Sequence, residues 1–204
     1  PAPITVLPSP RTVSATSRLD VIHHLRIPPE ETDKVQAVYN GVAEHFRPAT
    51  VGRDPDPARL RTVLYVGRAD PYKNLVVLVE AFACLQSHQD LATRLLLIGA
   101  IDPRYPEAPA RARELGIDKA VEWSSALPSE ALVEAYRQAA LLVMPSQYEG
   151  FGLPVAEAMA CGTPVICGDC GALREVGGSA AVFVPPRDPA ALAQEMYRVL
   201  SDPA

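Results

Sequence analysis

The chain has 204 residues, 48% of them hydrophobic, which is enough for one large α/β domain or for one domain and part of another. Its formal net charge of -5, from 24 acidic and 19 basic residues, leaves no basic field for a phosphate backbone, so nucleic acid is not an expected partner. No apolar run reaches the roughly 20 residues of a membrane-spanning helix, and the proline-rich start lacks the regions of a signal peptide, so we expect a cytoplasmic protein.

The first predicted elements form a short unit within residues 1–41. The stretches TVSATS, RLDVIHHLRI and KVQAVYNGV predict a strand, a helix and a strand. A single βαβ unit cannot bury both of its faces, so we expect residues 1–41 to self-associate or to be poorly ordered. Asn40-Gly41 predicts a turn, and the run from Phe46 to Pro57 predicts a linker, so residues 42–60 are interpreted as linker and domain start.

From residue 61 onward, short apolar runs alternate with amphipathic stretches. One helix is expected to begin with Asn74 as its N-cap, another with a capping-box-like start at Ser129, and a third after Asp188-Pro189. Strand followed by helix, repeated, predicts the α/β class and a doubly wound parallel sheet over residues 61–204, with ligands at the carboxyl ends of its strands. The predicted strands are Thr62–Val66, Arg94–Ile98, Val121–Trp123, Leu141–Met144, Pro164–Cys167 and Ala181–Val184, and the predicted helices are Asn74–Leu85, Ser129–Ala139 and Ala190–Leu200.

The four cysteines, Cys84, Cys161, Cys167 and Cys170, suit a reducing compartment better than a disulfide framework in a chain of this length. Cys167 and Cys170 form a CxxC, which in principle could serve redox chemistry or zinc. A zinc site needs a second pair of ligands, and the sequence has neither a second CxxC nor an HxxxH. We therefore interpret the cysteines as small buried apolar residues, with redox or metal binding as the alternative.

The stretch PSQYEGFGLPVAEAMACGTPVI places two carboxylates around the start of a predicted helix. Pro154 is expected as a first helical residue, so Glu149 lies in the preceding loop and Glu157 about one turn into the helix. Gly150 and Gly152 allow backbone N–H groups to approach a ligand, and the start of the helix favours an anion such as phosphate.

Two carboxylates would not face a phosphate directly. A close pair of like charges costs about 4 kcal/mol at an intermediate effective dielectric, so hydroxyl groups are better partners for Glu149 and Glu157. Carboxylates accept hydrogen bonds from vicinal diols. A ligand with a diol on each side of a phosphate group is a nucleotide sugar, which the pattern therefore predicts.

A second loop supplies cations. Gly67 and Arg68 follow the strand TVLYV, and Lys73 stands at the entrance to the next helix. Arg68 can hold phosphate oxygens with two parallel hydrogen bonds, while Lys73 acts as a point charge. The loop is neither GxxxxGK[ST] nor GxGxxG, so a P-loop is excluded and NAD is disfavoured.

Each of these features also has a purely structural interpretation. Glu157 could complement the helix dipole, which is worth about 0.3–1 kcal/mol. Arg68 and Lys73 could be a solvated loop, and Gly150 and Gly152 could be turn residues. The joint pattern favours a binding site, because both loops fall at strand ends where an open parallel sheet binds ligands.

These motifs resemble the nucleotide-sugar-binding, C-terminal half of GT-B retaining glycosyltransferases of family four, known as glycosyl transferases group 1. The similarity runs from about Val13 to Leu200. It is carried by VYNGV, VLYVGRADPYKNL, LLLIG, VEW, the stretch YEGFGLPVAEAMACGTPVI and GALREVGGSAAVFVPPRD. Glu149 and Glu157, with seven residues between them, are specific to this group when combined with Arg68 and Lys73.

The resemblance implies roles for these residues. Arg68 and Lys73, after Gly67, would bind the donor diphosphate, Glu149 the donor sugar, and Glu157 the ribose diol. The backbone of Phe151, Gly152 and Leu153 would meet the sugar and the distal phosphate. No metal or other cofactor is expected, because Arg68 and Lys73 would neutralise the leaving diphosphate and the sequence has no DxD motif.

The resemblance also has departures and gaps. Ser125 stands where the family has Gly, which concerns the base pocket, and Arg174 stands where the family often has Pro. The acceptor site and a donor-contacting His belong to an N-terminal domain of which residues 1–41 match only the last βαβ unit. We expect surface or packing roles for the histidines, and any membrane contact would involve the missing half. The histidines are His23, His24, His45 and His88.

We therefore predict the donor-binding half of an enzyme that moves a hexose from a nucleotide sugar to a hydroxyl acceptor with retention, and expect this fragment alone to bind without transferring. The motif style, YEGFGLP followed by GALREV, favours GDP-mannose. Two alternatives remain: a non-catalytic nucleotide-sugar-binding module, and a GT-B sugar phosphorylase or sucrose-synthase-like enzyme.

Overall fold

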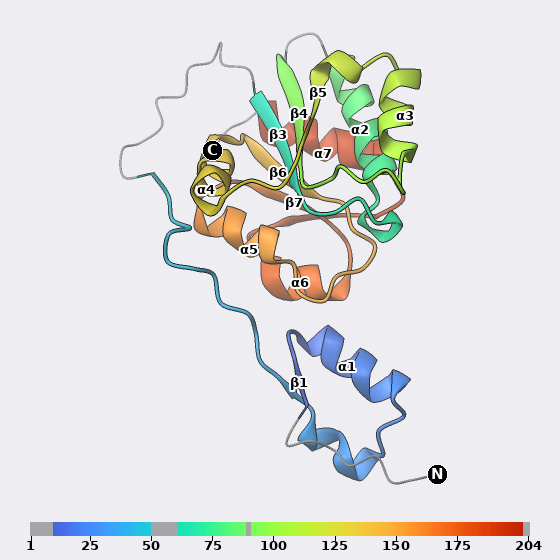
Figure 1. Cartoon of the computed structure of the whole chain (residues 1–204), viewed down its shortest axis with the longest axis vertical. Helices are drawn as coiled ribbons and strands as arrows, with labels where there is room; N and C mark the ends of the chain where they lie inside the picture. Colours follow the sequence, from blue (N-terminus) through green and yellow to red (C-terminus); the bar gives the residue numbers. More distant parts are fainter. Residues whose placement is uncertain (1–9, 50–60, 89–90, 202–204) are drawn as a thin grey trace.

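The structure is a computed structural model that describes residues 10–49, 61–88 and 91–201. Its main part is a six-stranded sheet with strand order β5-β4-β3-β6-β7-β8, in which every neighbouring pair is parallel. Figure 1 shows this part joined through an extended segment to a small N-terminal unit. The strands are β3 Arg61–Val66, β4 Thr93–Ile98, β5 Val121–Ser124, β6 Leu141–Met144, β7 Val165–Gly168 and β8 Val182–Val184.

Helices cover both faces of this sheet. On one face α2 contacts α3 and α7, and on the other α5 contacts α4 and α6 (Figure 1). The predicted α/β class and doubly wound parallel sheet are therefore confirmed. The helices are α2 Leu75–Gln86, α3 Glu107–Glu114, α4 Ser129–Gln138, α5 Leu153–Ala160, α6 Gly171–Gly177 and α7 Pro189–Ser201.

The apolar patterns account for the order of the strands. All four residues of β6 are buried, as expected for a central strand covered on both faces. In β5, at the edge, Glu122 is exposed while Val121 is buried. The six predicted strands and the three predicted helices are present with bounds that differ by at most one residue. The short helices α3 and α6 were not predicted, because α3 carries mostly charged residues and alanines, and α6 both begins and ends with Gly.

The N-terminal unit differs from the prediction. TVSATS was expected to be a strand, but β1 covers only Arg11–Thr12, and the helix α1, Ala15–His24, begins within this stretch. The reason is Ser14, whose hydroxyl caps the helix by accepting a hydrogen bond from the Ser17 amide. KVQAVYNGV likewise contains only the short strand β2, Gln36–Ala37, which pairs with β1 and follows a 3₁₀ turn at Pro29–Lys34.

Two smaller predictions were wrong, and a third was confirmed only in part. No turn lies at Asn40-Gly41; the chain turns instead at Glu44 and His45, where the Phe46 amide donates to the Ala43 carbonyl. Asn74 is the N-cap residue of α2, as predicted, but its backbone is left-handed and its side chain makes no capping hydrogen bond. Ser129 is the first residue of α4 rather than its cap, and its hydroxyl contacts His45. Most of the predicted linker, residues 50–60, lies outside the described residues.

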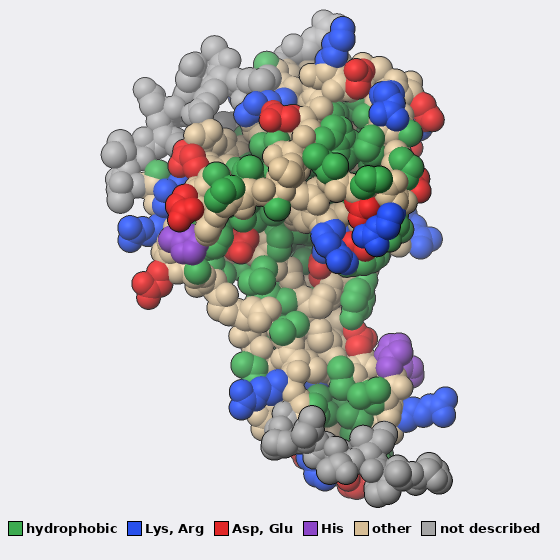
Figure 2. Space-filling view, viewed as in Figure 1, with side chains coloured by type: hydrophobic (Ala, Val, Ile, Leu, Met, Phe, Trp, Pro, Cys, Tyr) green, Lys and Arg blue, Asp and Glu red, His purple; other side chains and the backbone are tan. Residues whose placement is uncertain are grey.

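Figure 2 shows charged and hydrophobic side chains interspersed over the larger part, and a group of hydrophobic side chains on the small N-terminal part. Leu19 and Leu25 are 62% and 68% exposed there. Among the residues that the structure describes, no helix has the length and apolar character needed to cross a membrane.

Candidate functional site

The strand order brings two loops together. β3 lies between β4 and β6, so the connections that follow β3 and β6 run in opposite directions along the sheet. The loops after β3 and β6 both leave the carboxyl edge of the sheet, where such a divergence opens a binding site. They are joined by a hydrogen bond of 2.9 Å from the Gln147 amide to the Tyr72 carbonyl. The buried side chain of Asn74 reinforces this junction, since its Nδ2 donates to the carbonyls of Pro145, at 3.1 Å, and Pro186. The side chain of Asn74 thus ties the loops together and makes no capping hydrogen bond to α2.

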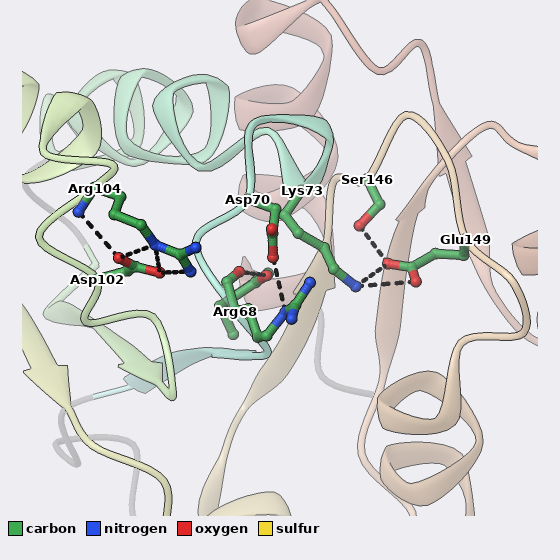
Figure 3. A network of polar contacts seen from close by, with 8 residues as sticks. Arg68, Asp70, Lys73, Asp102, Arg104, Ser146 and Glu149 are labelled. Carbon is green, nitrogen blue, oxygen red and sulfur yellow. Dashed lines mark hydrogen bonds and ion pairs between the residues drawn. The ribbon is translucent and has the colours of Figure 1, made fainter.

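Lys73 and Glu149 form an ion pair across the two loops, in which Glu149 is buried and Lys73 is partly buried (Figure 3). Lys73 Nζ lies 2.7 Å from Oε1 and 3.0 Å from Oε2 of Glu149, which is 8% exposed. Ser146, fully buried, donates its hydroxyl to Oε1 at 2.7 Å. Buried charges need partners of this kind, and the orientation of Glu149 is fixed by both contacts.

Arg68 lies beside this pair but faces solvent. Its Nε is 2.8 Å from Oδ2 of Asp70, and its side chain is 71% exposed (Figure 3). Hydrogen bonding to Tyr72 and the charge of Asp70 raise the pKa of Arg68. The backbone of Arg68 is fixed by the buried Tyr65, whose hydroxyl donates a hydrogen bond of 2.7 Å to the Arg68 carbonyl. Arg68 therefore combines a fixed main chain with a movable guanidinium.

The start of α5 follows Glu149 directly. Gly152 has φ 105°, and a Cβ there would meet Cδ2 of Leu173 at 2.6 Å, so the position requires glycine. Phe151 is buried, whereas Leu153 is 39% exposed. The backbone of this short turn is therefore the part of the loop that a ligand could approach.

Glu157 lies apart from the basic side chains of Arg68 and Lys73. Its Oε2 accepts a 2.8 Å hydrogen bond from the hydroxyl of Tyr136, a fully buried residue of α4. Within the part of the chain that the structure describes, Glu157 forms no hydrogen bond or ion pair with Arg68, Lys73 or Glu149. The sequence predicts one pocket for the four side chains; the structure joins Glu149 to Lys73 and turns Glu157 towards α4.

A third charged pair at the same edge was not predicted from the sequence. In the loop after β4, Arg104 contacts both carboxylate oxygens of Asp102, at 2.7 to 3.2 Å, and hydrogen bonding from Arg104 lowers the pKa of Asp102 to about 2 (Figure 3). A cavity of about 230 Å³ lies between the loop after β3, the start of α3 and Trp123. The Asp-Pro that follows both β3 and β4 is the sequence signal for these parallel loops.

The remaining candidates have structural roles. Cys167 is buried, and burial raises its pKa to about 12, which makes a reactive thiolate unfavourable. Cys84, by contrast, is exposed and Cys170 is half-buried, so the interpretation of the cysteines as buried is confirmed only for Cys161 and Cys167. Arg174 pairs with Asp169 at the surface, and Ser125 is exposed after β5. The histidines His23, His24, His45 and His88 are all exposed.

Comparisons with known proteins agree with the fold. The family model described as "Glycosyl transferases group 1" matches residues 53–204. A D-inositol 3-phosphate glycosyltransferase 1 from Catenulispora acidiphila is 34% identical over 190 residues, covering 84% of this chain and 44% of the relative. An MMP alpha-(1->4)-mannosyltransferase from Mycolicibacterium hassiacum is 34% identical over 200 residues, covering 97% of this chain and 46% of the relative. The chain thus spans less than half the length of these curated relatives.

Among the similar solved structures is a single domain that aligns with this chain over most of the domain's own length. It is the C-terminal domain of a glycosyl transferase group 1 family protein from Francisella tularensis, which is 26% identical with a TM-score of 0.68. The match covers 79% of this chain and 89% of that domain.

Proposed function

Because the chain belongs to the glycosyl transferases group 1 family, we propose that it binds the nucleotide-sugar donor of a hexosyltransferase between the loops that follow β3 and β6. The observation that carries the proposal is the ion pair of Lys73 with the buried Glu149 at this edge of the sheet, with Arg68 exposed beside it. A cation for phosphate and a fixed carboxylate for hydroxyls are thereby adjacent.

In the proposed complex, Arg68 and Lys73 hold the diphosphate and Glu149 accepts hydrogen bonds from the hexose. The backbone of Phe151, Gly152 and Leu153 contacts the sugar and the distal phosphate. As the anomeric bond breaks, negative charge collects on the leaving diphosphate, and the two cations stabilise that charge without a metal. Transfer with retention to a hydroxyl acceptor is proposed to need a part corresponding to the region of the curated relatives that this chain does not span.

Glu157 is proposed to bind the ribose. The ribose is separated from the diphosphate by its 5′ carbon, so Glu157 does not need to touch Arg68 or Lys73. Tyr136 occupies Oε2 of Glu157, and a diol would use Oε1. The donor sugar is proposed to be mannose carried by GDP; the motif style and the mannosyltransferase among the relatives support this choice. A cytoplasmic location is part of the proposal and is supported by cysteines that form no disulfide.

Calorimetric titration of the chain with UDP, GDP, ADP and their sugars tests the proposal. One nucleotide series should bind, and Arg68→Ala should weaken it by roughly 10- to 100-fold, the effect of one lost charge-assisted contact. Arg94→Ala is the matched control, because Arg94 pairs with Glu122 on neighbouring strands away from the loops. A flat response to every nucleotide would contradict the proposal, and transfer by the full-length protein would exclude the non-catalytic alternative.

Asp70→Asn is expected to tighten diphosphate binding by about 5-fold, which corresponds to roughly 1 kcal/mol. Asp70 holds the Arg68 guanidinium in the absence of ligand and would repel a diphosphate, so its neutralisation removes both a competitor and a like charge. Asp70 makes no side-chain cap, so the fold should be unaffected. Glu122→Gln, with the same change in net charge, should bind as the unchanged protein does; equal or weaker binding by Asp70→Asn would refute the competition.

A further inference from the structure

The start of α1 is held by a carboxylate from the main domain. Glu175 of α6 accepts hydrogen bonds from the Ala15 and Thr16 amides, each at 2.8 Å, and from the Thr16 hydroxyl. The Tyr39 hydroxyl adds a fourth bond at 3.2 Å. Amides at the start of a helix have no partner within the helix, and a negative charge is favourable there. Glu175 therefore attaches two parts of the N-terminal unit, α1 and the segment after β2, to α6.

The approach is close enough to demand a particular residue on α6. A Cβ at Gly171 would meet Oγ1 of Thr16 at 2.6 Å, so a side chain here would push α1 away. Desolvation disfavours the charged form of Glu175, yet the bonds from Thr16, Ala15 and Tyr39 outweigh it and lower the pKa of Glu175. The carboxylate is thus ionised at neutral pH in a contact built from backbone and small side chains.

The start of α1 also forms hydrogen bonds with the loop that carries Glu149. The hydroxyls of Ser14 and Ser17 donate to the carbonyl of Gly150, at 2.7 and 2.8 Å. Ser14 is fully buried in this contact. On the other side of Glu149, the Tyr148 hydroxyl donates to Oδ2 of Asp20, in α1, at 2.8 Å. The residues before and after Glu149 are therefore both attached to α1.

We propose that Glu175 is a positioning residue for the donor sugar: by holding the start of α1, it sets Ser14 and Ser17 against Gly150 and so fixes the Glu149 carboxylate and the turn that follows. The inference rests on the proposed function, because it assigns the sugar to this loop. Glu175 touches neither the diphosphate loop nor Lys73, so its influence is confined to the sugar end of the donor. The N-terminal unit thereby takes part in the donor site without contacting the donor.

The test compares a nucleoside diphosphate with its sugar. UDP against UDP-glucose, and GDP against GDP-mannose, are titrated into the unchanged chain and into Glu175→Ala. For the pair that binds, we expect Glu175→Ala to weaken the affinity for the nucleotide sugar by about 5-fold or more. The affinity for the nucleoside diphosphate should change by less than about 2-fold. A general loss of structure would weaken the binding of both ligands alike. A change in the ratio of the two dissociation constants therefore shows that Glu175 acts on the positioning of the sugar-binding loop.

Two further variants keep the test decisive. Ser14→Ala with Ser17→Ala removes the contacts to Gly150 while leaving Glu175 in place, and should change the ratio in the same direction even if Glu175→Ala fails to fold. Glu195→Gln is the matched control, because Glu195 pairs with Arg198 on the surface of α7. An unchanged ratio in the folded variants overturns the inference alone, whereas no binding of any nucleotide to the unchanged chain overturns the proposed function and the inference with it.

Discussion

Lys73→Ala is expected to lower the free energy of unfolding by about 3 kcal/mol, and to weaken nucleoside diphosphate binding by roughly 10- to 100-fold. The first effect arises because Glu149, 8% exposed, is left without its counter-ion. The Ser146 hydroxyl still donates to Glu149, so the loss should lie at the lower end of the cost of a broken buried pair. Urea denaturation and calorimetric titration measure the two effects separately.

A double variant separates charge balance from ligand contact. Lys73→Met with Glu149→Gln removes both charges and should recover most of the lost stability, since replacing a whole buried pair by neutral groups is often harmless. It should not recover diphosphate binding. Lys34→Ala is the control for a surface pair, because Lys34 contacts Glu31 with a side chain that is 57% exposed, and should cost less than about 0.5 kcal/mol. Full stability in Lys73→Ala would show that the ion pair contributes nothing.

Gly168→Ala is expected to destabilise the domain by about 3 kcal/mol or more, through steric conflict alone. Gly168 ends β7, and a Cβ there would lie 2.4 Å from the Ser146 carbonyl oxygen and 3.0 Å from the Pro145 carbonyl. These are backbone atoms, so the conflict can be relieved only by moving the loop that carries Glu149. Donor affinity should therefore fall together with stability.

The matched control is Gly41→Ala, because a Cβ at Gly41 meets nothing within 4 Å. The urea midpoints of the two variants measure the difference in their stability, provided that the dependence of the unfolding free energy on urea concentration is the same in both. The steric argument would be wrong if the midpoints of Gly168→Ala and Gly41→Ala agreed.

Much of the framework follows from the sequence alone. Continuous apolar runs such as β6 predict strands covered on both faces, and alternation with helices predicts a parallel sheet. The loops after β3 and β6 meet because the crossovers diverge between these neighbouring strands. The proximity of Lys73 to Glu149, 76 positions apart, is therefore a consequence of topology that a pattern can anticipate.

Side-chain partners between elements do not follow from periodicity. Glu157 finds Tyr136 because α4 and α5 pack together, and its sequence position alone indicates only a place near the start of a helix. The contact between Glu175 and Thr16 spans 159 positions and depends on how the N-terminal unit sits against α6. Arg68 has a partner two residues away, Asp70, that could have been anticipated from its charge.

Local capping explains the largest error in the predicted elements. TVSATS contains β-branched residues that favour a strand, but Ser14 is well placed to cap a helix, and the resulting hydrogen bond to the Ser17 amide starts α1 within the predicted strand. The same hydroxyl also reaches Gly150 of the donor loop. The cap and the contact together favour the helix over a longer strand, in a unit whose own sheet consists only of the two-residue strands β1 and β2.

A crystal structure of the chain with a bound nucleotide sugar tests the central claim most directly. The account predicts diphosphate oxygens within about 3.2 Å of the Arg68 guanidinium and Lys73 Nζ, with a sugar hydroxyl on the Glu149 carboxylate. A nucleotide seated elsewhere, for example in the cavity beside Trp123, with the ion pair of Lys73 and Glu149 unchanged and without contact to the ligand, would contradict it.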